Sequence, residues 1–449
     1  MKSSQDKLGE MPIGRLLIVM SVPMMISMLV QALYNLVDSM FVAQISENAL
    51  TAVSLAFPMQ ALMNAVAVGT GVGVSAYVSR SLGQGDSESA SRAASIQMVL
   101  SLIYSVLALA VGLGFSRSFY LSQTDVPEIV DQGEIYLRTV CVFSFGIFYG
   151  QNLEKLLVAT GSSALSMISQ ATGAVVNIAL DPVLIFGLGP FPKLGVYGAA
   201  LATVIGQFLA AVLALIFNLS FNKAARFSLR LMRPDRRVLA GVYSVGIPSM
   251  ITVGLASITS FCLNQILLGF STTAAAVYGI WIKMQSFGFM PVYGLNNGTI
   301  AIYSYNYGAG RTDRLRRTLR LALFMGIGIT LLISAAFELL PGEMLALFKA
   351  SDYMYSIGIG AMRVCAMSLP FGAACIILAS PCQSLGRPGY TLFINICRQV
   401  LIQVPAAWLL ARTGELGAIW YSVIIAEVLT TVIASCLTAS LMRRIEKNG

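Results

Sequence analysis

Residues 34–44 read YNLVDSMFVAQ, and Asp38 lies deep within an apolar run that begins near Leu16. A run of about 20 apolar residues crosses a hydrocarbon core of roughly 30 Å as a helix. A carboxylate inside such a run is costly, and ionisable groups placed there usually face the bundle interior and mark a transport pathway. The stretch therefore predicts a membrane-spanning helix that carries a functional acid.

The composition extends this reading to the whole chain. Of 449 residues, 57% are hydrophobic and only 11% are charged, and the mean hydropathy is +0.77, whereas soluble domains carry about 25% charged residues. We expect an all-α integral membrane protein with twelve transmembrane helices. The expected crossings lie near 14–44, 52–80, 90–116, 130–158, 163–188, 194–221, 239–269, 274–306, 317–341, 354–380, 388–411 and 414–441.

The chain repeats itself at a constant offset of 225 residues. Six crossings per half bring both halves into the membrane from the same side, which predicts two six-helix lobes related by a pseudo-two-fold axis along the membrane normal. We place an N-terminal lobe at 1–221, a cytoplasmic linker at 222–238 and a C-terminal lobe at 239–449. Two such lobes facing each other are typical of alternating-access carriers. The matching pairs include Pro23 and Pro248, Gln60 and Gln285, Gly69 and Gly294, Gly73 and Gly298, Gly85 and Gly310, and Gly161 and Gly386.

The lysines and arginines predict the orientation. Most lie on one side of the crossings, including the run RFSLRLMRPDRR at 226–237, while the other side receives only Arg117, Lys193, Lys349 and Arg412. The positive-inside rule then places both termini in the cytoplasm. We expect the chain in the plasma (inner) membrane. Because the basic residues follow membrane topology, the net charge of +9 indicates no nucleic-acid partner. We expect the lipid bilayer and small organic cations as partners. We expect a monomer.

Polar residues within three crossings suggest an ion site. Asp38 on the first crossing, Asn177 and Asp181 on the fifth and Thr203 on the sixth all fall in the outer half of the N-terminal lobe at about 1.5 Å per residue. Two nearby carboxylates in a low dielectric do not both stay ionised, so such a pair takes up a proton. With the Asn177 and Thr203 oxygens it would instead hold a small hard cation such as Na⁺. The alternative is a structural role, in which each acid is bonded to nearby amides or hydroxyls.

Three further charges lie inside crossings of the second half. We expect Arg398 and Glu427 to form a buried structural pair with Lys283 nearby. Other chemistry is excluded by what the sequence lacks: it has no histidine and no G-x-x-x-x-G-K-[ST] phosphate loop. We therefore expect no enzyme activity and no cofactor apart from the coupling ion, and no metal except Na⁺ at the four residues above.

Several segments together resemble the multidrug and toxic compound extrusion (MATE) transporters along almost the whole chain. The resemblance rests on long segments in both halves of the chain. An acid on the first helix together with N-x-x-x-D-P on the fifth looks like the pattern of a DinF/MepA-like branch. The quoted segments are SVPMMISMLVQALYNLVDSMFVAQ (21–44), AFPMQALMNAVAVGTGVGVSAYVSRSLGQGD (56–86), NIALDPVLIFG (177–187), GVYGAALAT (195–203) and AVYGIWIKMQSFGFMPVYGLNNGTIAIYSYNYGAG (276–310).

The resemblance implies a function and roles for individual residues. MATE transporters are secondary antiporters that export cationic amphipathic compounds in exchange for H⁺ or Na⁺. It implies that Asp38, Asn177, Asp181 and Thr203 form the cation site and that the first helix bends at Pro23. It also implies a substrate cavity, in which we place Gln31, Tyr34, Asn35, Gln60 and Asn64.

Two other classes of function stay open from the sequence. A lipid-linked precursor flippase of the same superfamily would need a large basic cavity with several central arginines, and only Lys283 or Arg398 could serve here. A membrane enzyme or receptor is the remaining alternative, and it would turn over substrate in detergent without any gradient.

Overall fold

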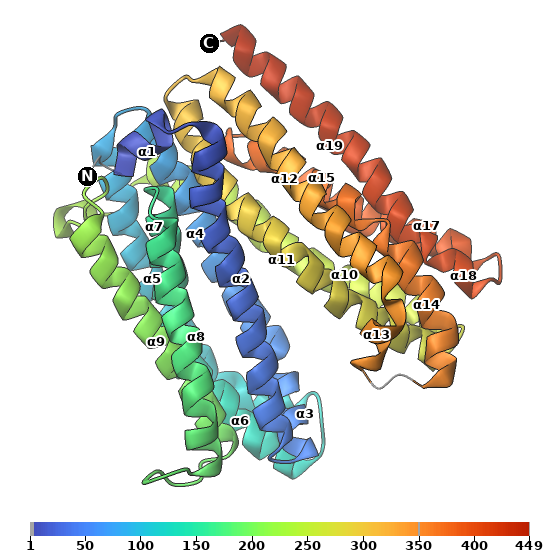
Figure 1. Ribbon diagram of the computed structural model, residues 1–449. Coiled ribbons are helices and arrows are strands. Elements are labelled where there is room, and N and C mark those ends of the chain that lie inside the picture. Colours follow the sequence, from blue (N-terminus) through green and yellow to red (C-terminus); the bar gives the residue numbers. More distant parts are fainter. Residues whose placement is uncertain (1–3, 349–350, 449) are drawn as a thin grey trace. The chain divides into compact units, whose positions relative to one another are not determined.

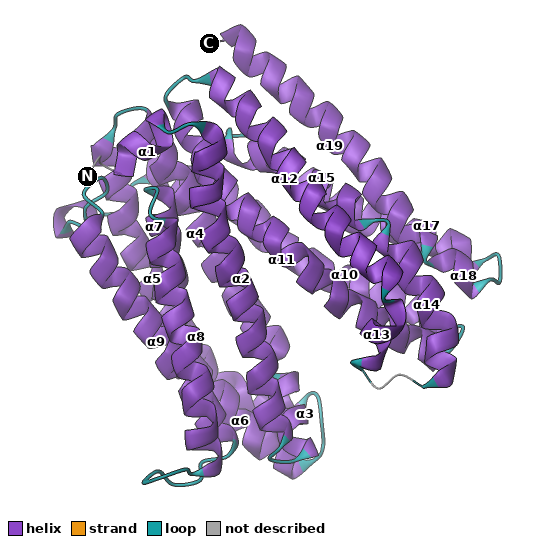
Figure 2. Ribbon diagram, viewed as in Figure 1, coloured by secondary structure: helices purple, strands orange, loops and turns teal. Residues whose placement is uncertain are grey.

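The computed structural model describes residues 4–348 and 351–448, in which every regular element is a helix (Figures 1 and 2). Lys349, used above to predict orientation, lies outside the described residues. The first half of the chain forms α1 (Ser4–Glu10), α2 (Ile13–Ala43), α3 (Glu47–Leu55), α4 (Phe57–Gly83), α5 (Ser87–Leu121), α6 (Pro127–Val142), α7 (Phe145–Ala159), α8 (Ser163–Phe186) and α9 (Val196–Phe221).

The second half follows the same plan after a short connecting segment. Its elements are η1 (Leu229–Leu231), α10 (Arg236–Leu268), α11 (Thr272–Gly308), α12 (Thr312–Leu339), α13 (Pro341–Ala346), α14 (Asp352–Ala366), α15 (Leu369–Ser384), α16 (Pro388–Ile396), η2 (Cys397–Ile402), α17 (Gln403–Ala411), α18 (Leu416–Ile419) and α19 (Tyr421–Asn448).

The expected twelve-crossing, all-α fold is confirmed. Several crossings consist of two helices in succession, such as α3 with α4 and α6 with α7. Within the described residues, ten helical segments are long and apolar enough to span a membrane by length and composition. The segments 127–159 and 272–308 have membrane length but fall outside that group. The chain is a multi-pass membrane protein.

Turn geometry repeats with the sequence. Gly85 and Gly310 end equivalent crossings with φ of 78° and 69°, and Gly161 and Gly386 do so with φ of 83° and 84°. A residue with a side chain is disfavoured at such angles, so glycine is required where the chain reverses after each helix. These pairs are separated by the same 225 residues as the sequence matches.

The helices form two compact units. Unit 1 comprises the residues up to Glu10 together with Ile26–Gly246, and unit 2 comprises Met11–Met25 together with the residues from Ile247 onward. Both divisions fall inside helices, within α2 and α10, and each lies within three residues of the helix-interior proline, Pro23 or Pro248. The first part of each of these helices therefore belongs to the unit formed mainly by the other half of the chain.

Glycines explain how the first parts of α2 and α10 fit where they do. In unit 2, a Cβ at Gly298 of α11 would lie 2.6 Å from Ser21 Oγ. In unit 1, a Cβ at Gly73 of α4 would collide with the Val242 carbonyl of α10. Small residues allow membrane helices to approach this closely, and Gly73 and Gly298 are repeat partners.

Candidate functional site

The four residues expected to bind an ion all lie in unit 1, on three helices. Asp38 lies in the last part of α2, Asn177 and Asp181 on α8, and Thr203 near the start of α9. Asp38 and Asp181 are close enough to interact electrostatically. The structure therefore brings together two carboxylates that are more than 140 positions apart in the sequence.

Close packing of α8 on α9 positions the amide and the hydroxyl. A Cβ on either Gly173 or Gly206 would lie 2.6 Å from the carbonyl oxygen of the other, so the two backbones nearly touch and the helices run side by side (Figure 1). Four residues after Gly173, Asn177 Nδ2 lies 3.4 Å from Thr203 Oγ1 and donates a hydrogen bond to it. This bond uses the amide nitrogen and leaves Asn177 Oδ1 available as an acceptor.

The oxygens at this site are buried and lack protein donors. Asp181 has no exposed surface, and Asn177 and Thr203 are also buried. Among the described residues, no hydrogen-bond donor reaches Asp181 Oδ1, Asp181 Oδ2, Asn177 Oδ1 or Asp38 Oδ1. Buried polar atoms are normally paired, and buried charges need a counter-charge. A proton on one of the acids, or a small cation among these oxygens, would supply a partner that the protein does not, so the chemistry of the donor set fits H⁺ or Na⁺.

Two tyrosines complete the surroundings of the acids. Tyr34, one turn before Asp38, interacts electrostatically with both Asp38 and Asp181. Tyr136 of α6 interacts with Asp38, and its hydroxyl accepts a hydrogen bond of 3.2 Å from Gln60 Nε2 of α4. Tyr136 is not evident from the sequence, because the pattern EIYLRT around it does not distinguish a tyrosine at a polar site from one that only packs.

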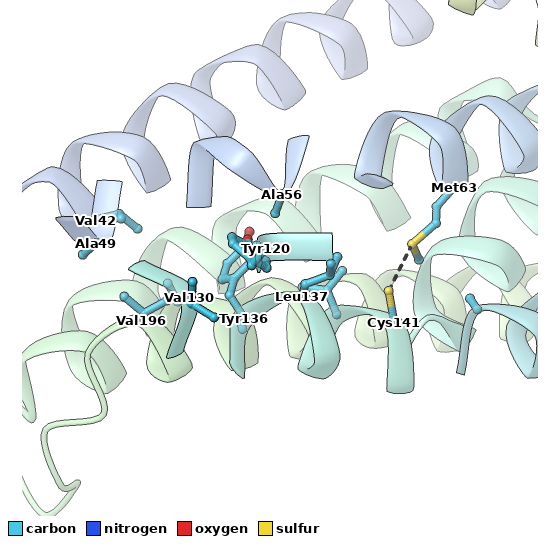
Figure 3. Packing of buried hydrophobic residues seen from close by; sticks show 14 of the residues in the cluster. Val42, Ala49, Ala56, Met63, Tyr120, Val130, Tyr136, Leu137, Cys141 and Val196 are labelled. Carbon is cyan, nitrogen blue, oxygen red and sulfur yellow. Dashed lines mark hydrogen bonds between the residues drawn. The ribbon is translucent and has the colours of Figure 1, made fainter. Parts of the chain in front are cut away.

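An apolar cluster holds Tyr136 in place. Figure 3 shows Tyr136 beside Tyr120, Val130 and Leu137, all fully or almost fully buried. Tyr120 donates a hydrogen bond of 2.7 Å to the Ala52 carbonyl, which ties α5 to α3. Packing in this cluster therefore restricts the position of the Tyr136 ring.

The remaining expected cavity residues are more exposed. Gln31, Gln60 and Asn64 are half-buried, and Asn35 is exposed. Pro23 lies inside α2, which continues as a helix on both sides of it.

The intramembrane charges of unit 2 separate into a pair and a single cation. Arg398 Nη2 lies 2.6 Å from Glu427 Oε1, and Arg398 Nε donates to both Glu427 oxygens at 2.9 and 2.8 Å. Both residues are buried. Lys283 is exposed, and its ammonium lies 5.7 Å from the centre of the Phe348 ring.

Unit 1 contains two more buried charges, which the sequence pattern does not mark as intramembrane groups. Glu154 and Lys155 of α7 are 7% and 8% exposed and interact with each other. Gly71 of α4 makes room for the lysine, because a Cβ there would lie 2.8 Å from Lys155 Cγ. Their burial depends on how α7 is rotated against its neighbours, which the sequence does not reveal.

Known proteins resemble this chain over most of its length. The family model described as MatE matches residues 23–183 and 248–409, once in each repeat. The chain is 25% identical over 433 residues to "Multidrug export protein MepA" of Staphylococcus haemolyticus (strain JCSC1435), covering 95% of this chain and 93% of that protein. It is 29% identical over 407 residues to an "FAD transporter" of Shewanella oneidensis (strain MR-1), covering 88% of each.

A solved structure gives the same result for the fold. It is described as the outward-facing conformation of a multidrug resistance MATE family transporter of the MOP superfamily. The two structures match with a TM-score of 0.93 at 26% sequence identity, and the match covers 100% of this chain and 99% of the other. The predicted resemblance is thus confirmed. The protein belongs to the MATE family, whose members are transporters and not enzymes.

Proposed function

We propose that this protein is a secondary antiporter that exports cationic amphipathic compounds in exchange for H⁺ or Na⁺. The observation that carries the proposal is the convergence of buried oxygens without protein donors on Asp38, Asn177 and Asp181. Such a site is incomplete until an ion arrives. The name of the MepA relative supports multidrug export.

Each residue of the site has a distinct part in this proposal. Asp38 and Asp181 provide the negative charge that an incoming proton or Na⁺ neutralises. Thr203 orients the Asn177 amide, so that Oδ1 of Asn177 remains available to the ion. Tyr34 and Tyr136 surround the acids and restrict access of water to them.

Ion binding drives transport only if it changes the free-energy difference between outward- and inward-facing states. We propose that neutralising the two acids allows α2 to bend at Pro23, which changes the cavity lined by Gln31, Tyr34, Asn35, Gln60 and Asn64. A cationic compound favours the state in which the two acids are ionised. The coupling ion favours the state in which it has neutralised them. The exchange then follows from competition for the same negative charge.

The charges at the site favour a cation as cargo. The two groups that interact there are carboxylates, and Arg398 is neutralised by Glu427, so the basic cavity that a lipid-linked precursor would require is not assembled from these residues. The FAD transporter among the relatives makes FAD a necessary comparison substrate. We place the protein in the plasma membrane as a monomer with both termini in the cytoplasm.

Purified protein in proteoliposomes tests the proposal. A fluorescent lipophilic cation and FAD are supplied separately, and a pH gradient and a Na⁺ gradient are imposed separately. We expect one of the two gradients to drive transport of the cation. Asp38→Asn and Asp181→Asn should each reduce gradient-driven transport at least about tenfold, because the acid that binds the ion is removed.

Asp131→Asn is the matched control, since Asp131 is an exposed acid paired with Arg117 on α5. It should transport like the unmodified protein. Unchanged transport in both Asp38→Asn and Asp181→Asn, with the protein folded and inserted, would overturn the mechanism. Transport of FAD but not of the cation would overturn the proposed cargo.

A further inference from the structure

Unit 2 has an open groove on a face that the proposed transport mechanism does not use. The groove has a volume of about 470 Å³ and lies between α10 and α17. Both helices contribute a continuous stripe, because the residues recur at steps of one and four along each helix. The lining consists of Phe261, Cys262, Gln265, Ile266, Val404, Pro405 and Trp408.

The groove opens where α10 and α17 part. Before it, the Thr259 hydroxyl of α10 donates a hydrogen bond of 2.9 Å to the Gln399 carbonyl in the π-helical segment η2. This bond joins α10 to the helix that continues as α17, a few residues before the lining of the groove begins. Beyond it the walls are apolar and accessible, with Phe261 65% and Trp408 48% exposed. An open apolar groove between two membrane helices matches a hydrocarbon chain better than a polar ligand.

An arginine side chain lies against Trp408, one of the residues that line the groove. The Arg412 guanidinium lies 3.7 Å from the centre of the Trp408 ring, and residue 412 directly follows the end of α17. From Val404 to Arg412 the chain rises about 12 Å at 1.5 Å per residue, so Arg412 lies beyond the lining residues, at the end of α17. Among the ion pairs recorded for the described residues, none includes Arg412. By contrast, Arg117 pairs with Asp131 and Glu134.

We propose that this groove binds one anionic glycerophospholipid, with an acyl chain along Phe261, Ile266 and Val404 and the phosphate on Arg412. A guanidinium binds phosphate oxygens through a planar set of N–H donors. Stacking on Trp408 restricts the Arg412 side chain, so less conformational freedom is lost when the phosphate binds. The occupant is thus a lipid of the leaflet at which α10 and α17 end, and the site is separate from the ion site of unit 1.

Trp408 provides a direct readout, because brominated acyl chains quench a nearby tryptophan. The other tryptophans, Trp281 and Trp420, are buried and are replaced by phenylalanine. The protein is reconstituted with brominated phosphatidylglycerol or brominated phosphatidylcholine at increasing fractions. We expect half-maximal quenching of Trp408 at an about fivefold lower fraction of brominated phosphatidylglycerol than of brominated phosphatidylcholine. The factor follows from the attraction of about 1 kcal/mol that one basic residue contributes at an anionic membrane surface.

Arg412→Gln should abolish that preference, whereas Arg117→Gln, which removes a paired arginine on the same expected side, should retain it. Native mass spectrometry of the unmodified chain and of Arg412→Gln checks the same point without replacing any tryptophan. One retained phosphatidylglycerol that Arg412→Gln loses supports the site. Equal quenching by both lipids in the unmodified protein, or retention that Arg412→Gln leaves unchanged, shows only ordinary boundary lipid and overturns the proposal. Neither result bears on ion coupling at Asp38 and Asp181.

Discussion

Arg398 and Glu427 form a buried ion pair in unit 2 at the positions that Gly173 and Ala202 occupy in unit 1, one repeat of 225 residues earlier. In unit 1, Gly173 allows α8 and α9 to touch and to place Asn177 beside Thr203. In unit 2 the same place between equivalent helices is filled by an arginine and a carboxylate that satisfy each other. The two repeats therefore share a backbone arrangement but differ in chemistry. Unit 1 leaves carboxylate oxygens without protein partners, whereas in unit 2 the arginine and the glutamate neutralise each other.

Breaking the pair on one side should destabilise unit 2. Arg398→Met leaves the Glu427 carboxylate buried without a counter-charge, and such losses cost about 3–5 kcal/mol. The double variant Arg398→Met with Glu427→Leu removes both charges and should recover most of that free energy of unfolding. Unfolding in mixed detergent with increasing SDS measures all three proteins. A double variant as unstable as the single one would show that the pair is not the cause.

The contact between α8 and α9 should tolerate no added side chain. In Gly206→Ala the new methyl would lie 2.6 Å from the Gly173 carbonyl and 3.0 Å from Asn177 Cβ, and overpacking of this kind costs about 1–3 kcal/mol. Gly254→Ala on α10 is the control, because a Cβ there meets nothing within 4 Å. It should be neutral or slightly stabilising, as alanine favours helix over glycine by about 1 kcal/mol. Thermal unfolding in detergent separates the two, and equal effects would contradict the contact.

The Thr203 hydroxyl should be needed for ion coupling, whereas its methyl group should not. Thr203→Val has nearly the same shape but removes the acceptor of the Asn177 amide, and one hydrogen bond contributes about 0.5–1.5 kcal/mol. We expect the ion concentration for half-maximal transport to rise about two- to tenfold in Thr203→Val and to stay unchanged in Thr203→Ser. Thr172→Val on α8, where the hydroxyl donates to the Ile168 carbonyl of the same helix, is the control. If Thr203→Val and Thr203→Ser behave alike, the hydroxyl has no part in coupling.

Acid should release the segment that connects the two repeats. The Arg237 backbone N–H, at 2.8 Å, and Arg92 Nη1, at 3.0 Å, hold the pKa of Asp235 below its ordinary value of about 3.9. Because the folded-state pKa is the lower one, this stabilisation is complete above about pH 4 and is lost as the pH falls through the folded-state value. Hydrogen exchange of residues 222–238, corrected for intrinsic rates, should therefore accelerate below that pH.

In Asp235→Asn the same segment should exchange rapidly already at neutral pH. Asp125→Asn, a change to an exposed acid in the loop between α5 and α6, should leave the profile as it is in the unmodified chain. Exchange in 222–238 that depends on pH equally with and without the Asp235 carboxylate would assign the effect to another group.

Much of the architecture follows from the sequence because its causes are local. An apolar run of membrane length has to form a helix, since lipid offers no partner to an open backbone, and the 225-residue repeat fixes that the second half copies the first. The acids Asp38 and Asp181 are also evident from the sequence, since a carboxylate within such a run is rare. Features that depend on the residues of one apolar segment can therefore be predicted from the sequence.

The tertiary structure alone decided which groups meet, because contact depends on the rotation of each helix and on the neighbour it selects. It placed Tyr136 at the acids, buried Glu154 and Lys155, and assigned the first part of α2 to unit 2 and that of α10 to unit 1. It also left the oxygens of Asp38, Asn177 and Asp181 without protein donors. Those relationships join segments far apart in the chain, and no pattern within one segment encodes them.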